Sequence, residues 1–141
     1  MTGGSQILHA GCVALNGRGL LILGASGAGK SALALSMMAL GARLVADDRT
    51  ILTVDGDALI ATCPATLRGL IEARGIGILH AEALDAAPLV LAVDMDQTEA
   101  QRLPPLRSVT FLNRTITLVH SVPSPHFPAA LVQYLRAGRQ A

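Results

Sequence analysis

The strongest constraint on the fold of this chain is the stretch GASGAGKS at residues 24–31. It fits the phosphate-binding pattern G-x-x-x-x-G-K-[ST], in which glycines let the backbone turn so that successive N–H groups face phosphate oxygens. The apolar run LLIL precedes it, and the helix-forming run KSALALSMMAL follows it and ends at Gly41. The pattern therefore predicts a buried strand, a glycine-rich loop and a helix whose N-terminus points at an anion.

Each polar residue of this stretch has an expected task. Lys30 reaches the β- and γ-phosphates of a nucleotide, and the Ser31 hydroxyl binds Mg²⁺. Lys30 is also the single lysine of the chain, whose other basic residues are arginines, so a compact ammonium is favoured at this point. The alternative is a glycine-rich turn without a ligand. The predicted nucleotide-binding residues are Gly24, Ala25, Ser26, Gly27, Ala28, Gly29, Lys30 and Ser31.

The rest of the chain mixes hairpins with strand–helix units. Asn16-Gly17 and Asp55-Gly56-Asp57 each separate two apolar stretches and predict hairpins. Together these signals predict one α/β domain over residues 1–141, with a P-loop, a mixed sheet, hairpins and few helices. The remaining predicted elements are strands at 7–8, 43–46 and 88–93, extended segments at 70–73 and 76–79, a short helical turn at 97–103, a β-rich segment at 109–119 and a terminal helix at 128–137.

Composition narrows the partners. The net charge of +1, the absence of a basic run and the 2% aromatic content argue against nucleic acid and anionic lipid, so a small molecule or a protein is expected. Cys12 and Cys63 lack metal-ligand spacing, and neither a zinc site nor a disulfide is predicted. No leader and no apolar run of about 18 residues is present, which predicts a cytoplasmic protein without a membrane segment.

Acidic residues follow the strand after the predicted helix. Asp47-Asp48 stands where a P-loop fold carries its metal-associated carboxylate, and neighbouring side chains on an extended backbone point to opposite faces. One carboxylate could thus approach Mg²⁺ while the other approaches an acceptor hydroxyl; a solvated turn is the alternative. Glu72 and Arg74 precede a flexible turn and suit a second metal ligand and a phosphate clamp, or else an exposed pair. Asp94 and Asp96 are expected on the surface, with a position in the cleft as the alternative.

Three blocks together resemble the catalytic domain of HPr kinase/phosphorylase. They are HAGCVALNGRGLLILGASGAGKS, GARLVADDRT and IEARGIGILH, at residues 9–31, 41–50 and 71–80. The resemblance covers about His9 to Leu103 and implies a fold of the HPr kinase/PEP carboxykinase type in a short form that holds only the C-terminal catalytic domain. It implies an ATP- and Mg²⁺-dependent kinase that phosphorylates a serine on the phosphocarrier protein HPr of the sugar phosphotransferase system.

The resemblance also implies roles for individual residues. His9 assists the catalytic aspartate, which accepts the serine proton in phosphorylation and returns it in the reverse reaction. By spacing Asp48 is the first choice for that aspartate and Asp47 the second. Glu72 is the Mg²⁺-associated carboxylate, in addition to the Ser31 hydroxyl. Arg102 occupies the place of a later catalytic arginine. With Lys30, these are the predicted catalytic and metal-binding residues.

The sequence departs from the family pattern after about Pro105. There the chain has Pro, Phe and His in place of the basic phosphorylase element, so the reverse reaction is left open. The family's hexamers imply a homo-oligomer. Two other functions stay open: a non-catalytic regulator that binds ATP, and a small-metabolite P-loop kinase, against which the lack of an Arg-rich lid argues. The acceptor serine and the physiological output are not predicted.

Overall fold

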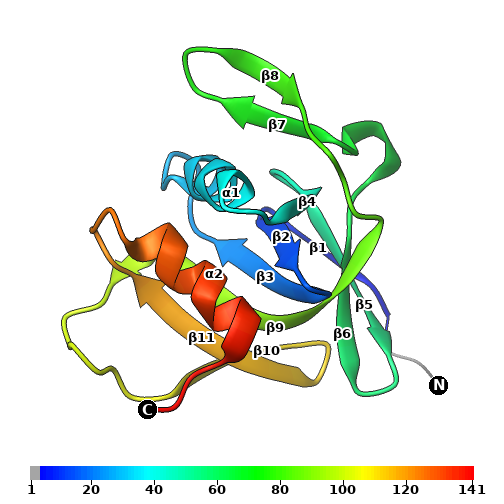
Figure 1. The fold of residues 1–141 in the computed structure, drawn as a ribbon. Coiled ribbons are helices and arrows are strands. Elements are labelled where there is room, and N and C mark those ends of the chain that lie inside the picture. Colours follow the sequence, from blue (N-terminus) through cyan, green and yellow to red (C-terminus); the bar gives the residue numbers. More distant parts are fainter. Residues whose placement is uncertain (1–3) are drawn as a thin grey trace.

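The computed structural model describes residues 4–141, which form eleven strands and two α-helices (Figure 1). The helices, of 10 and 11 residues, are too short to cross a membrane, and no helix of the described chain is long and apolar enough to do so. The elements are β1 (Gln6–Leu8), β2 (Gly11–Leu15), β3 (Arg18–Leu23), α1 (Lys30–Ala39), β4 (Arg43–Ala46), β5 (Thr50–Asp55), β6 (Ala58–Thr62), a 3₁₀ turn (Ala65–Leu67), β7 (Leu70–Ala73), β8 (Gly77–His80), β9 (Ala86–Thr98), β10 (Arg107–Phe111), β11 (Arg114–Ser121) and α2 (Phe127–Ala137).

Strand β9, with 13 residues, joins the two halves of the main sheet. Its first residues pair antiparallel with β6, which continues to β5 and β1. From Leu89 onward it pairs parallel with β3 on one side, and from Leu91 with β11 on the other. Antiparallel strands β2 and β4 extend the sheet beyond β3, and β10 extends it beyond β11. The predicted α/β fold with a mixed sheet is confirmed.

The central strands are buried on both faces. Leu20 and Ile22 of β3 pack in one cluster with Met37 of α1 and with side chains of α2, and the two helices cover that face (Figure 1). The side chain of Leu21 points to the opposite face of the sheet and packs in a second cluster with Leu52 of β5 and with residues of β6. This burial on two sides is the reason why the run before the glycine-rich loop is apolar throughout.

Strands β7 and β8 form a separate two-stranded sheet that projects from the rest of the molecule (Figure 1, top). Ile71 and Ala73 of β7 are buried, and Ile71 packs in the cluster that contains α1. All four residues of β8 are exposed. The β7–β8 hairpin is therefore attached to the core through one face of one strand.

Most predicted boundaries agree with the structure, and one element is wrong. Both predicted hairpins are present, and Asn16 and Gly17 have the positive φ values of 53° and 74° that a two-residue hairpin turn requires. The helical turn predicted at 97–103 is not formed, because β9 continues to Thr98 and pairs there with Ser121 of β11. Helix α2 begins one residue earlier than predicted, with Pro128 in its first turn.

Candidate active site

The glycine-rich loop connects β3 to α1, as predicted. Gly24, Gly27 and Gly29 have φ values of 148°, 84° and 94°, which side chains disfavour. A Cβ atom on Gly24 would also lie 3.0 Å from Cβ of Met95 and 3.1 Å from Cβ of Ala28. The first glycine is thus required both by its backbone angle and by the close approach of β9.

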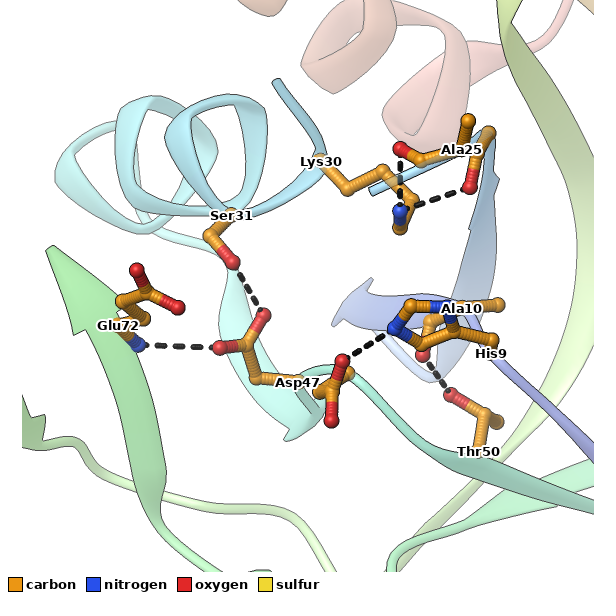
Figure 2. A network of polar contacts seen from close by, with 10 residues as sticks. His9, Ala10, Ala25, Lys30, Ser31, Asp47, Thr50 and Glu72 are labelled. Carbon is orange, nitrogen blue, oxygen red and sulfur yellow. Dashed lines mark hydrogen bonds and ion pairs between the residues drawn. The ribbon is translucent and has the colours of Figure 1, made fainter. Parts of the chain in front are cut away.

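Lys30, at the start of α1, is only 8% exposed. Its Nζ donates hydrogen bonds to the carbonyl oxygens of Gly24 and Ala25, at 2.7 and 2.9 Å (Figure 2). The N–H group of Ala25 donates in turn to the two carboxylate oxygens of Asp96, at 3.1 and 3.0 Å. The first part of the loop is therefore held by a cation and an anion through different backbone groups.

Asp96 is the residue of this arrangement that the sequence analysis did not include in the site, since a surface position was preferred for it over one in the cleft. It lies in β9, which runs parallel to β3 and so ends at the same edge of the sheet as the loop. The apolar run at 89–93, which is followed by Asp94, indicates a buried strand. The sequence does not reveal that β9 pairs with β3, however, and so it does not indicate that this strand ends beside the loop.

Asp47 follows β4 and is 8% exposed. The Ser31 hydroxyl donates to one of its carboxylate oxygens at 2.7 Å, and the N–H group of Glu72 donates to the other at 3.0 Å (Figure 2). Asp47 therefore links α1, β4 and β7. Both of its oxygens are engaged with the protein.

Asp48 is turned the other way. Its φ of 69° is unusual for a residue other than glycine, and a hydrogen bond of 2.8 Å from the Arg49 N–H group to the Asp47 carbonyl closes a tight turn around it. The Asp48 carboxylate lies 2.5 Å from Nε2 of His9, and the side chains of both residues are more than half exposed. The Thr50 hydroxyl fixes the two segments by a buried hydrogen bond of 2.9 Å to the Ala10 carbonyl (Figure 2).

These side chains meet around one cavity of about 480 Å³. Of the predicted site residues, the cavity brings together those of the helix start, the acidic pair, His9 and β7. Gly24, Ala25 and Ala28 do not line it, and neither does Arg102, which lies on the exposed segment between β9 and β10. The lining residues are His9, Ser26, Gly27, Gly29, Lys30, Ser31, Ala32, Leu35, Asp47, Asp48, Glu72, Ala73 and Arg74.

The donor set suits a nucleotide with a small hard cation. Within residues 4–141 no group of three His, Cys, Asp or Glu side chains could hold a metal ion. The cavity does offer the Ser31 hydroxyl and the Glu72 carboxylate as oxygen ligands, and the Asp47 carboxylate lies beside Ser31. Mg²⁺ is commonly bound by one or two carboxylates together with substrate phosphates, so these residues fit a Mg²⁺–nucleotide complex better than a metal held by the protein alone.

The two cysteines differ in their surroundings. Burial raises the pKa of the Cys12 thiol far above its ordinary value. Burial also raises the pKa of Cys63, which directly follows β6. The Arg68 guanidinium lowers that pKa, and the Asp47 carboxylate raises it further. Cys63 therefore responds to a charge of the cavity, although it does not line the cavity.

Comparisons with known proteins agree with this architecture. Residues 3–91 match the family model described as the HPr Serine kinase C-terminal domain. The matched range includes His9, the loop, the acidic pair and Glu72, and it excludes Arg102. In the solved structures, the HPr(Ser) kinase/phosphatase from Coxiella burnetii superposes with a TM-score of 0.78 over 93% of this chain and 94% of that chain. The sequence identity is 24%, so this likeness bears on the fold alone.

Curated relatives share a larger fraction of residues. An HPr kinase/phosphorylase from Stenotrophomonas maltophilia (strain K279a) is 35% identical over 121 residues, which is 85% of this chain and 34% of the relative. One from Limosilactobacillus reuteri (strain DSM 20016) is 41% identical over 88 residues, 62% of this chain and 28% of the relative. The chain thus spans about a quarter to a third of the length of the curated relatives that it matches.

Proposed function

Because the chain belongs to the HPr Serine kinase C-terminal domain family, we propose that it is an ATP-dependent protein-serine kinase whose acceptor is a serine of the phosphocarrier protein HPr. The observation that carries the proposal is the contact of 2.5 Å between His9 and Asp48 at a cavity that the phosphate-binding loop also lines. The His9–Asp48 pair is the candidate base on one side of this cavity, and the loop is the candidate phosphate site on the other.

The geometry favours Asp48 over Asp47 as the base. Both oxygens of Asp47 already accept hydrogen bonds, from Ser31 and from the Glu72 backbone. Asp48 has an exposed carboxylate, and its close side-chain partner within residues 4–141 is His9. A group that takes a proton from an incoming hydroxyl must be open to that hydroxyl, and the exposure of the Asp48 side chain supports this role.

The proposed chemistry is a single transfer. Asp48 accepts the proton of the serine hydroxyl as its oxygen bonds to the γ-phosphorus of ATP, and the bond from that phosphorus to the β–γ bridging oxygen breaks to leave ADP. Lys30 turns from the loop carbonyls toward the phosphates and stabilises the charge on the transferred group. The N–H groups at the start of α1 bind the phosphate oxygens.

Ser31 and Glu72 would hold the Mg²⁺ ion, with Asp47 orienting the Ser31 hydroxyl through its hydrogen bond of 2.7 Å. The ion would neutralise phosphate charge. The role of Arg102 stays a prediction, as do the homo-oligomer, the reverse phosphorylase reaction and the single-domain organisation of residues 1–141.

The test is mass spectrometry of HPr from the same genome after incubation with the protein, ATP and Mg²⁺. We expect one added phosphoryl group on a serine, and no such product with Lys30→Ala or Asp48→Asn. A protein that binds ATP but adds no phosphoryl group to HPr would be a nucleotide-dependent regulator. Transfer to a metabolite in place of HPr would make it a small-molecule kinase. Either result refutes the proposal.

A further inference from the structure

A second hollow, of about 340 Å³, lies beside the nucleotide cavity. It is lined by Ile7 and Leu8 of β1, by Arg49, and by His9 and Asp48. His9 and Asp48 line both hollows, so the pair stands at the place where the two meet. A group bound in the second hollow would have direct access to the Asp48 carboxylate.

The in-line geometry of phosphoryl transfer suggests that the acceptor binds in this second hollow. The attacking oxygen and the leaving oxygen lie roughly in line through phosphorus, so the acceptor must approach the γ-phosphoryl from the side away from ADP. The phosphate-binding loop and the start of α1 hold the ADP side of the nucleotide cavity in the proposed function. The acceptor therefore enters from the side of His9 and Asp48, and the second hollow opens on that side.

The lining of the hollow has two features that suit a protein segment. Ile7 is 62% exposed, which is high for a large apolar side chain on a strand. Arg49 is exposed, and the ion pairs among residues 4–141 involve His9, Arg43, Arg68 and Arg107 but leave Arg49 without a carboxylate. An apolar contact and an unpaired cation thus flank the candidate base.

We propose that this hollow is the acceptor subsite. Ile7 and Leu8 contact an apolar side chain next to the acceptor serine, and Arg49 pairs with a carboxylate of the same segment. The proposal rests on the proposed kinase function and deepens it, since it names the chemistry of the segment that the enzyme selects: a serine flanked by an apolar residue and an acidic residue.

The experiment measures KM for HPr and KM for ATP separately in Arg49→Ala, Arg49→Glu and Ile7→Ser. An exposed ion pair contributes up to about 1 kcal/mol, so Arg49→Ala should raise KM for HPr about three- to five-fold. Arg49→Glu replaces attraction by repulsion and should raise it more than about ten-fold. We expect KM for ATP to stay within about two-fold. Arg136→Ala, which removes an exposed arginine of α2, is the matched control and should change neither constant.

Acceptor variants identify the partner of Arg49. Each acidic residue near the HPr serine is changed in turn to Lys; one of these variants should be a poor substrate of the wild type and a better substrate of Arg49→Glu. An unchanged KM for HPr in Arg49→Glu, or an equal rise in both Michaelis constants, would overturn the subsite while the kinase function stands. A wild type that does not phosphorylate HPr would refute the proposed function and, with it, the subsite.

Discussion

Two walls of the same cavity are built in different ways. The wall formed by the glycine-rich loop, the start of α1 and the end of β4 has buried charged groups, Lys30 and Asp47, each 8% exposed and each with two hydrogen-bond partners. The opposite wall is the β7–β8 hairpin, which forms a sheet of its own and exposes every residue of β8. A hydrogen bond from the Glu72 N–H group to Asp47 joins the walls.

This difference between the walls agrees with their proposed roles in the reaction. Groups that stabilise charge in a transition state must be held in place before the reaction, because reorganisation would cost part of their effect. A wall with few buried apolar contacts opens locally at a lower free energy than the core does. The loop wall therefore suits phosphate chemistry, and the hairpin wall suits the entry and release of the nucleotide.

The largest expected effect separates two cations of this cavity. Lys30→Ala should lower turnover about 10²- to 10³-fold, as the loss of a transition-state donor does elsewhere, and should weaken ADP binding far less. Arg74→Ala removes an exposed cation of the hairpin wall and should lower turnover much less. Steady-state kinetics and calorimetric ADP titration measure the two quantities. Equal losses of turnover in the two variants would show that the walls do not differ in the proposed way.

The attachment of the hairpin gives the next effect. Ile71 is 1% exposed, and Ile71→Ala should lower the free energy of unfolding by about 2–5 kcal/mol because it removes buried methylene groups and leaves a cavity. Ile78, in the same hairpin, is 63% exposed, and Ile78→Ala should change stability by less than about 0.5 kcal/mol. Urea unfolding measures both variants. Similar values for the two would contradict the attachment through β7.

The same contrast explains how much of the molecule could be predicted. The strand, the loop and α1 follow from local sequence, because the glycines and the apolar run at 20–23 each have one favourable local structure. The end of β9 does not, since Thr98 is extended by its pairing with Ser121, 23 positions later in the sequence. A local pattern of polar residues and prolines there predicted a helical turn, and tertiary pairing decided otherwise.

The site shows the same limit. The spacing of the acidic pair after the loop predicted carboxylates near Ser31, and the hydrogen bond between Ser31 and Asp47 agrees with that. The contact of His9 with Asp48 spans 39 residues and could be expected only through the resemblance to a family. Asp96 was missed because its contact with the loop depends on which strand lies beside β3.

Asp96 allows a smaller test of how the loop wall is held. Asp96→Ala removes the acceptor of the Ala25 N–H group, and a hydrogen bond to a charged, partly solvated group contributes enough to weaken ATP binding about three- to ten-fold. Asp96→Asn keeps one acceptor oxygen and should lose less. Titration calorimetry measures both, with Asp57→Ala, in the exposed β5–β6 turn, as control. Tighter ATP binding in both Asp96 variants would mean that the carboxylate acts on the phosphates by repulsion and does not hold the loop.

The smallest expected effect comes from Cys63, which precedes the segment leading to the hairpin. Its pKa is raised above the ordinary 9.0, first by burial and also by the Asp47 carboxylate, while Arg68 opposes the shift. The folded protein therefore keeps the thiol proton to higher pH than the unfolded chain does, and this contribution to stability is lost as the pH rises through the folded pKa. Since the thiolate is the reactive form, iodoacetamide at about pH 8.5 should modify Cys63 more slowly in the folded than in the unfolded chain.

Asp47→Asn removes one of the two contributions that raise this pKa, so it should speed modification of Cys63 a few-fold. Peptide mapping distinguishes this site from Cys12, which is fully buried and should stay unmodified until the chain unfolds. Faster modification of both cysteines in Asp47→Asn would indicate general loosening, because Asp47 links α1, β4 and β7. Faster modification of Cys63 alone would show that the charge of the loop wall acts beyond the cavity, at the strand end from which the chain continues to the hairpin.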